Sequence, residues 1–530
     1  MSTDGPRVEL YDTTLRDGAQ RADLSYTVED RLRILHRLDQ VGFPFVEGGW
    51  PGANPRDSEF FRVAAKETLK TSRLVAFGMT RRAGERAEKS QVLGDLLEAG
   101  TEFVCLVGKA WDLHVIEALR TDLEEGVAMV RDSVSFLRQQ GRRVFFDAEH
   151  FFDGYWSDGS FAMRVLAAAE EAGAERLVLC DTNGGMLPFD VGRIVAEVKE
   201  HVSVPLGIHV HNDTGCAVAN SLVAVDAGVV QVQGTINGYG ERTGNADLVP
   251  IAADLVLKMG VTDALPDGAI EHLTELAHYV AEVANVAPDS YQPYVGRFAF
   301  THKAGLHTSG VARVARAYEH VAPETVGNRR GVVASDHGGR ATIRLKAAEL
   351  GVEIDEEAVP RVVEEVKTKV TEGYAFDVAD ASLELLIRGG AGWSQPFFEV
   401  ESYRVHVEER VGDAEPPLAE AMVKVVTKGS RHIESAEGHG PVGALDNALR
   451  KALTNDYPEL AHMSLEDYRV RVLSEQGGTG AVVRVLIDTT NGERAWTTVG
   501  VSENIIEASW QALTDAYLFG LLHPREAHDA

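Results

Sequence analysis

The segment HVH contains two histidines, His209 and His211, with a spacing that suits neighbouring metal ligands. It overlaps the end of a short apolar run, Leu206–Val210, that predicts a β-strand. Residues i and i+2 of a strand point to the same side, so both imidazoles can converge on one point. Neutral imidazole is a common ligand of divalent metals. An isolated HxH pair more often places one histidine in a core and one at a rim, so the metal hypothesis depends on partners elsewhere.

The segment DTTLRDG supplies such partners, because Arg16 and Asp17 follow another predicted strand just before a glycine turn. Asp17 could complete a face of two imidazoles and one carboxylate, which leaves coordination positions open for a substrate. Arg16 could then stabilise an oxyanion. For these two residues alone, an ion pair in a loop is the alternative. Asp12, deeper in the strand, is expected to support the loop through hydrogen bonds.

Further polar residues stand at the ends of other predicted strands, namely Glu47, Glu149, Asp181 and Thr182. A buried carboxylate is costly unless it is paired or hydrogen-bonded, so several at one end of a fold indicate a functional site. The last predicted strand leads into GYGERTGNADL, residues Gly238–Leu248. There Gly240 would let the backbone approach a ligand closely, and Asn245 could bind a metal or support a metal ligand. Together these patterns predict a metal-dependent enzyme.

Eight apolar runs carry these residues. They are Val8–Leu15, Phe45–Gly49, Leu74–Gly78, Phe103–Gly108, Val144–Glu149, Leu177–Asp181, Leu206–Val210 and Val230–Ile236, with amphipathic helical patterns such as Val28–Val41 and Ala162–Ala172 between them. Alternating strands and helices predict a parallel sheet with right-handed crossovers, and eight such units in about 250 residues predict an α/β fold of the (β/α)8 TIM-barrel type. A doubly wound open sheet is the competing fold. The polar residues follow most of the strands and no strand precedes GxGxxG, which favours the barrel.

The rest of the chain changes character. A helical stretch, Ile270–Thr371, contains the polar segment His302–Gly310, and a glycine-rich break follows at Arg388–Pro396. Two strand patterns and a helix then occur twice, as Tyr403–Glu409, Ala421–Thr427 and Val442–Leu453, and as Tyr468–Glu475, Ala481–Asp488 and Glu503–Phe519. The repeat predicts a duplicated α+β domain with a regulatory or dimerising role. The predicted domains are a catalytic barrel (1–270), a helical subdomain contributing to the active site (271–390) and a C-terminal regulatory domain (391–530).

The composition of the chain excludes several classes of protein. The net charge of −29 argues against binding to nucleic acid or to an anionic membrane. No apolar stretch reaches the roughly 18 residues of a membrane span, and the N-terminus lacks the pattern of a secretory signal. The three cysteines, Cys105, Cys180 and Cys216, form no disulfide framework. We therefore expect a cytoplasmic protein.

The motifs DTTLRDG, HVHND, GYGERTGNADL and HKAGLHTSG, in this order, resemble those of the Claisen-condensing enzymes that act on acyl-CoA. These form the 2-isopropylmalate synthase/homocitrate synthase family of the DRE-TIM metallolyase superfamily. The resemblance spans essentially the whole chain, including the duplicated C-terminal domain. The segments EGGWPGANPRD (Glu47–Asp57) and GWSQPFFEVESYRV are similar to the citramalate synthase branch of that family.

The resemblance implies roles for individual residues. The metal ligands would be Asp17, His209 and His211, with Asn245 as an additional or supporting ligand, and the ion would be Mn, Mg, Co or Zn. Arg16 would contact the keto oxygen, Glu47 would complete the Asp-Arg-Glu set, and Thr182 would hold the substrate carboxylate with Glu149 close by. His307 would act in acetyl-CoA activation or product hydrolysis, with Tyr318 as the candidate catalytic tyrosine. Ser309 stands where many members of the family have an acidic residue.

The implied reaction is the condensation of acetyl-CoA with pyruvate and water to give citramalate and CoA. The nearest alternative uses 2-oxoisovalerate and gives 2-isopropylmalate. Two others are a lyase or aldolase running in the cleavage direction and an inactive barrel that senses an amino acid. The resemblance also implies a homodimer and isoleucine as an allosteric inhibitor.

Overall fold

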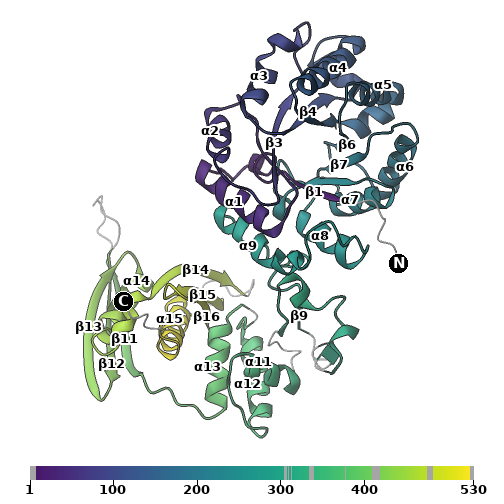
Figure 1. Cartoon of the computed structure of the whole chain (residues 1–530). Helices are drawn as coiled ribbons and strands as arrows, with labels where there is room; N and C mark the ends of the chain where they lie inside the picture. The colour runs from purple at the N-terminus through teal and green to yellow at the C-terminus, as the bar shows by residue number, and fades with distance from the viewer. Residues whose placement is uncertain are drawn as a thin grey trace. The chain divides into compact units, whose positions relative to one another are not determined.

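The computed structural model describes residues 8–303, 307, 310–311, 313–332, 339–376, 378–408, 418–473 and 481–525. The chain divides into two compact units, residues 1–300 with 321–330 and residues 301–320 with 331–530 (Figure 1). No helix in the described part of the chain combines the length and apolar character that a membrane crossing requires.

The first unit is built on a closed barrel of eight parallel strands, counted over the described residues. They are β1 (Glu9–Asp12), β2 (Phe45–Gly49), β3 (Arg73–Met79), β4 (Phe103–Lys109), β5 (Arg143–Glu149), β6 (Arg176–Asp181), β7 (Leu206–Val210) and β8 (Gln231–Gly234). Strand β8 closes the barrel by pairing with β1, with Gln233 opposite Tyr11. The predicted TIM-barrel fold is confirmed, and each strand lies within or overlaps a predicted apolar run.

Helices follow the strands and cover the outside of the barrel (Figure 1). They are α1 (Val28–Val41), α2 (Pro55–Ala64), α3 (Gln91–Glu98), α4 (Leu123–Gln139), α5 (Phe151–Glu171), α6 (Pro188–Lys199), α7 (Ala217–Asp226) and α8 (Leu248–Leu257), with α9 (Leu273–Val283) after them. Helix α1 shows how the sequence sets these limits. Thr27 and Asp30 form a capping box at its start, and Gly42 ends it in the left-handed conformation that favours glycine.

Aromatic side chains fill the inside of the barrel. The rings of Phe45, Phe103 and Phe145 lie 5.1 to 5.2 Å apart between centroids and belong to a buried cluster of their own. Alternate residues of a strand share a side, so Glu47 and Asp147, two positions after Phe45 and Phe145, also point inward. The aromatic cluster thus forms an apolar floor beneath the polar carboxyl end of the barrel.

The second unit begins with a short parallel pair, β9 (Thr301–His302) and β10 (Gly331–Val332). Three helices follow among its described residues, α11 (Arg340–Glu349), α12 (Val359–Glu372) and α13 (Asp380–Gly390). Leu383 and Ile387 of α13 share a buried cluster with Val499 and Val501 near the C-terminus. Helix α13 therefore contributes to the packing of the C-terminal sheets.

The C-terminal part contains a duplicated motif, as the sequence predicts. Its first copy is β11 (Phe398–Glu408), β12 (Leu418–Thr427), β13 (Ser430–Gly438) and α14 (Pro441–Leu453); its second is β14 (Ser464–Val472), β15 (Val483–Thr490), β16 (Ala495–Ser502) and α15 (Ile505–Leu522). In the described residues each copy thus has an antiparallel sheet of three strands, where the sequence pattern predicted two.

The two missed strands, β13 and β16, are each the second arm of a hairpin. Thr427 pairs with Ser430 across Lys428 and Gly429, which both have positive φ, as a two-residue hairpin turn requires. Asn491 and Gly492 precede β16 and form the most characteristic hairpin dipeptide. The turn signals were present in the sequence, but β13 carries many charged residues and lacks an apolar run.

Candidate active site

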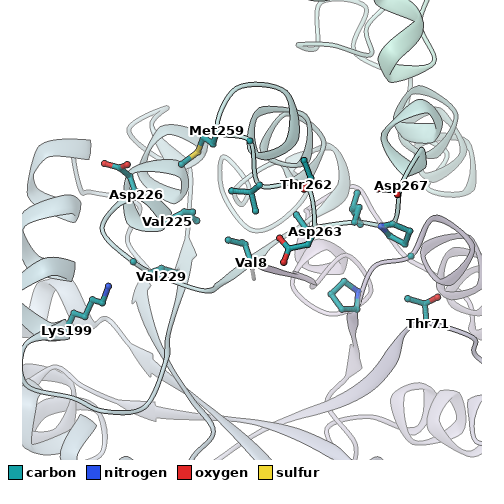
Figure 2. A pocket seen from close by; sticks show the side chains of 18 residues that line it. Val8, Thr71, Lys199, Val225, Asp226, Val229, Met259, Thr262, Asp263 and Asp267 are labelled. Atoms are coloured by element: carbon teal, nitrogen blue, oxygen red, sulfur yellow. The ribbon is translucent and has the colours of Figure 1, made fainter. Parts of the chain in front are cut away.

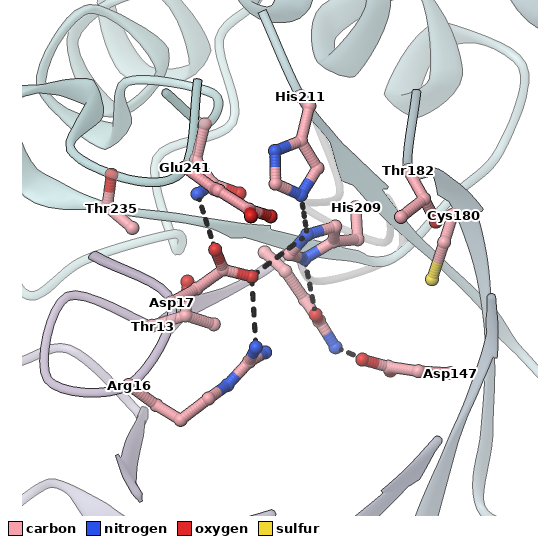
Figure 3. A network of polar contacts seen from close by, with 12 residues as sticks. Thr13, Arg16, Asp17, Asp147, Cys180, Thr182, His209, His211, Thr235 and Glu241 are labelled. Carbon is pink, nitrogen blue, oxygen red and sulfur yellow. Dashed lines mark hydrogen bonds and ion pairs between the residues drawn. The ribbon is translucent and has the colours of Figure 1, made fainter. Parts of the chain in front are cut away.

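The loop after β1 is held by its own polar residues. Asp12 accepts hydrogen bonds from the backbone N–H of Thr14 at 3.0 Å and from the Thr14 hydroxyl at 2.7 Å. Asp12 therefore supports the loop, as predicted. The loop directs Arg16 and Asp17 toward the carboxyl end of the barrel, where the candidate metal ligands lie (Figure 3).

Arg16 is fixed by three neighbours. Its Nε donates to Glu47 Oε1 at 2.5 Å, its Nη1 lies 3.1 Å from Asp17 Oδ2, and its guanidinium stacks on the Phe77 ring at 3.8 Å. Tyr11 donates to the second oxygen of Glu47 at 2.6 Å. Burial alone would lower the pKa of Arg16, but the charges of Glu47 and Asp17 raise it above its usual range. Arg16 is thus a fixed cation at the site.

Asp17 comes from the loop after β1, and His209 and His211 come from the carboxyl end of β7; all three are buried and lie together. Asp17 Oδ2 lies 3.5 Å from His209 Nε2, and the Nε2 atoms of the two histidines are 3.4 Å apart. Ligands about 2.1 Å from one ion lie roughly 3.0 to 3.4 Å from each other. Two nitrogen lone pairs and a carboxylate at these separations fit a shared divalent cation.

The protonation of these groups also suits a metal. Burial alone would raise the pKa of Asp17, but the charge of Arg16 and the hydrogen bond from Asn245 hold it well below its usual range. Burial, with His209 beside it, lowers the pKa of His211 to about 4. At neutral pH Asp17 is therefore a carboxylate and the His211 ring is neutral, which are the forms that bind metals.

Asn245 places its side-chain amide beside the three candidate metal ligands. Its Nδ2 donates to Asp17 Oδ1 at 3.0 Å and to the Tyr239 carbonyl at 3.2 Å, whereas its buried Oδ1 has no hydrogen-bond partner among the described residues. An unsatisfied buried carbonyl oxygen is costly, and a metal ion would satisfy it. Gly240 has a φ of 151°, and a Cβ there would lie 2.1 Å from Asn245 Nδ2. In this structure Gly240 makes room for Asn245.

A cavity of about 320 Å³ opens beside these residues. Thr182 and Glu149, predicted to bind substrate, both line it. The Thr182 hydroxyl oxygen accepts a hydrogen bond from the His150 backbone N–H at 2.9 Å, so its own hydrogen is available to another acceptor. Glu149 forms an ion pair with Lys109 at 2.5 Å. The cavity is of a size that holds small ligands.

Among the polar residues at this site that were not predicted are Asp147 and Gln233. Gln233 contacts His209 at 3.0 Å and Asp147 at 3.0 Å (Figure 3). Burial, with the charge of Glu47 nearby, raises the pKa of Asp147 to about 6. Strand periodicity could have identified Asp147, because it lies two positions before Glu149 on the same side of β5.

A larger cavity of about 980 Å³ lies at the opposite end of the barrel. It is lined by residues that precede strands, such as Val8, Thr71 and Val229, and by Lys199 and Asp263 (Figure 2). Catalytic residues of TIM barrels project from the carboxyl ends of the strands. The smaller cavity beside Asp17 is therefore the candidate active site, despite its size.

The predicted residues His307 and Tyr318 belong to the second unit, whereas the metal ligands belong to the first. Both are exposed in the described structure, and their rings lie 5.3 Å apart between centroids. The structure thus brings these two residues together. Ser309 lies outside the described residues.

The barrel, with a carboxylate and two imidazoles converging at its carboxyl end, defines a TIM-barrel protein with a candidate divalent-metal site. The HMGL-like family model matches residues 7–280, and the chain belongs to this family. The homocitrate synthase post-HMGL domain-like model matches residues 294–373, and the LeuA allosteric (dimerisation) domain matches residues 377–519. The predicted family resemblance and fold class are confirmed.

Several relatives match over nearly their full length. A protein of Streptomyces coelicolor named (R)-citramalate synthase is 52% identical, over 97% of this chain and 96% of its own. One of the same name from Synechocystis is 47% identical, over 98% and 97% of the two chains. A probable 2-isopropylmalate synthase of Methanopyrus kandleri is 35% identical, over 96% and 97%.

Proposed function

We propose that this chain catalyses the condensation of acetyl-CoA with pyruvate and water to give (R)-citramalate and CoA, a step toward isoleucine. The observation that carries the proposal is the near full-length identity of 52% and 47% to two proteins named (R)-citramalate synthase. The lower identity of 35% to a probable 2-isopropylmalate synthase favours pyruvate over 2-oxoisovalerate as the 2-oxo acid. This is an acyltransferase reaction in which the acyl group becomes an alkyl group.

Asp17, His209 and His211, with Asn245 Oδ1, are the residues that would hold a divalent ion. A bound ion supplies Lewis-acid polarisation of a keto oxygen. The fit rests on the close approach of the ligand atoms and on the unsatisfied Asn245 oxygen described above. Mn, Mg, Co and Zn all accept this set of ligands.

Arg16 and Thr182 position the 2-oxo acid in this proposal. The Thr182 hydroxyl donates to the substrate carboxylate, because its oxygen already accepts from the His150 N–H. Arg16 faces the developing negative charge on the former keto oxygen and stabilises it. Glu47 keeps the guanidinium of Arg16 in place through the contact at 2.5 Å.

A base removes a proton from the methyl group of acetyl-CoA, and the resulting carbanion attacks the keto carbon to form the new C–C bond. The C–O π bond opens in this step, and the oxygen takes up a proton to become the hydroxyl group of the product. Glu149 lines the cavity and is a candidate for this base; His307 of the second unit is the other. Water then cleaves the thioester, and CoA leaves as the thiol. The hydrolysis makes the overall reaction run toward synthesis.

The LeuA-type domain supports two further proposals. Its allosteric and dimerisation character implies an effector and a dimer, and we infer that the effector is isoleucine, the end product of the proposed route. A cytoplasmic location follows from the same biosynthetic role.

The product identifies the reaction directly. The full chain is incubated with Mn²⁺, acetyl-CoA and pyruvate, and the acids formed are separated by chiral chromatography. We expect (R)-citramalate in amounts equal to the CoA released, and almost none with Asp17→Ala, which removes a proposed ligand. CoA release without citramalate, or undiminished product from Asp17→Ala, would contradict the proposal.

A further inference from the structure

We propose that Asp147 and Gln233 form a hydrogen-bonded relay that decides which nitrogen of His209 carries its hydrogen. The relay leaves the other nitrogen free to bind a metal. Neither Asp147 nor Gln233 belongs to the proposed set of ligands, and both act as positioning residues. The inference rests on the metal centre proposed above.

The relay runs across the inside of the barrel. Asp147 lies on β5, Gln233 on β8 and His209 on β7, and all three side chains are buried. Gln233 Nε2 donates to Asp147 Oδ1 at 3.0 Å, and Gln233 Oε1 lies 3.0 Å from His209 Nδ1. In Figure 3 one side of the His209 ring faces Asp17, and Asp147 lies on the other side of that ring.

The chemistry of each group fixes the direction of the relay. An ionised carboxylate only accepts hydrogen bonds, so Asp147 requires the NH₂ end of the Gln233 amide. The carbonyl end of Gln233 then faces His209 and accepts, so His209 must carry its hydrogen on Nδ1. The lone pair is left on His209 Nε2, which is the atom 3.5 Å from Asp17 and 3.4 Å from His211 Nε2.

Asp147 removes an ambiguity that Gln233 alone would leave. An amide side chain can turn by 180° and exchange its donor and acceptor ends. A turned Gln233 would donate to His209 Nδ1, which would place the ring hydrogen on Nε2 and block that atom as a ligand. The carboxylate of Asp147 disfavours the turned state because it would then face the amide oxygen.

The experiment measures Mn²⁺ affinity by titration calorimetry on chelator-stripped full-length protein at pH 8, where Asp147 is ionised. Gln233→Leu removes the acceptor for His209 Nδ1 without changing net charge. We expect its affinity to fall by about 10- to 100-fold, the usual effect of losing a hydrogen-bond partner of a metal-binding histidine. Asp147→Ala is expected to weaken binding within the same range, although Gln233 separates it from the ring.

The double variant Asp147→Ala/Gln233→Leu separates the relay from a simple effect of charge. If Asp147 acts through Gln233, the double variant binds Mn²⁺ as Gln233→Leu does, because no amide remains to be oriented. If Asp147 acts only by its charge, the two losses multiply, and the relay is wrong. Phe145→Leu, on the same strand and the same side, is the control for disturbance of the barrel interior, and it should retain the affinity.

Thermal unfolding of the metal-free variants guards against a purely structural effect. The relay predicts that its variants bind Mn²⁺ more weakly, although their metal-free unfolding temperatures fall no further than that of the control variant Phe145→Leu. Full affinity in Gln233→Leu would overturn the relay and leave the metal centre standing. Failure of the unaltered protein to bind Mn²⁺ would instead overturn the metal centre itself.

Discussion

At the scale of single residues, the site depends on a fixed charge pattern. Arg16 contacts Glu47, Asp17 and the Phe77 ring at once, which a lysine could not reproduce because it lacks a planar group with several donors. The same guanidinium helps to keep Asp17 ionised. Arg16 thus keeps the proposed metal ligand Asp17 ionised, and the guanidinium itself also lies beside the cavity.

Thr182→Val tests the proposed substrate contact at this scale. Valine keeps the shape of threonine but removes the hydroxyl, and a hydrogen bond to a charged group is worth about 1.5 to 3 kcal/mol. We expect the KM for pyruvate to rise by roughly tenfold or more, with the KM for acetyl-CoA much less affected. Steady-state kinetics measure both constants. Thr182→Ser retains the hydroxyl and should stay close to the unaltered enzyme; equal losses in both variants would argue against the contact.

At the scale of elements, the sequence predicted the residues that end strands better than those within them. Asp17, His209 and His211 follow or close apolar runs, so the barrel rule brought them to one end. Asp147 and Gln233 lie inside β5 and β8, and their contact depends on the curvature and register of a closed sheet. A pattern in the sequence does not specify that register, because it reports the period of a strand and not its neighbours.

The carboxyl group of Asp515 lies in the contact between α13 and α15 and makes the free energy of unfolding depend on pH. Burial raises the pKa of Asp515 to about 7, although the hydrogen bond from Ser382 and the charge of Lys369 oppose the shift; Ser382 Oγ donates to Asp515 Oδ2 at 2.6 Å. The folded state thus holds a proton that the unfolded chain loses near pH 4. Stability from this group is present below pH 4 and is lost as the pH rises through 7.

Asp515→Asn mimics the protonated form and removes this dependence. Above pH 7 we expect the variant to be more stable than the unaltered protein by on the order of 1 kcal/mol, less than the full shift because the side chain is partly exposed. Near pH 4 the two should be alike. Calorimetric unfolding temperatures across this range measure the difference. A constant difference at every pH would show that Asp515 does not titrate in this way.

At the scale of the whole molecule, the chain joins a barrel unit to a second unit with a LeuA-type domain. The sequence predicted both, because a repeat and an alternating pattern are local signals. It could not assign His307 and Tyr318 to a unit, because that assignment depends on contacts between segments distant in sequence. Their proposed catalytic roles stay predictions.

The effector proposal also concerns the whole chain. We expect isoleucine to lower the rate of CoA release by the full-length enzyme and to raise its unfolding temperature, since a ligand that binds the folded state stabilises it. Leucine at the same concentration is the matched control and should have little effect. Inhibition by leucine and not by isoleucine would point to the leucine pathway instead.

The central claim is that this site condenses acetyl-CoA with pyruvate. The most direct test is kcat/KM for CoA release, measured with Mn²⁺ for pyruvate, 2-oxoisovalerate, 2-oxobutyrate, 2-oxoglutarate and glyoxylate in parallel. The two acids differ in the size of one side group, and one or two methylene groups in a pocket are worth about 1 to 3 kcal/mol. This corresponds to a factor of about ten or more, so we expect kcat/KM for pyruvate to exceed that for 2-oxoisovalerate by at least tenfold. A preference for 2-oxoisovalerate, or no CoA release with any of these acids, would contradict the account.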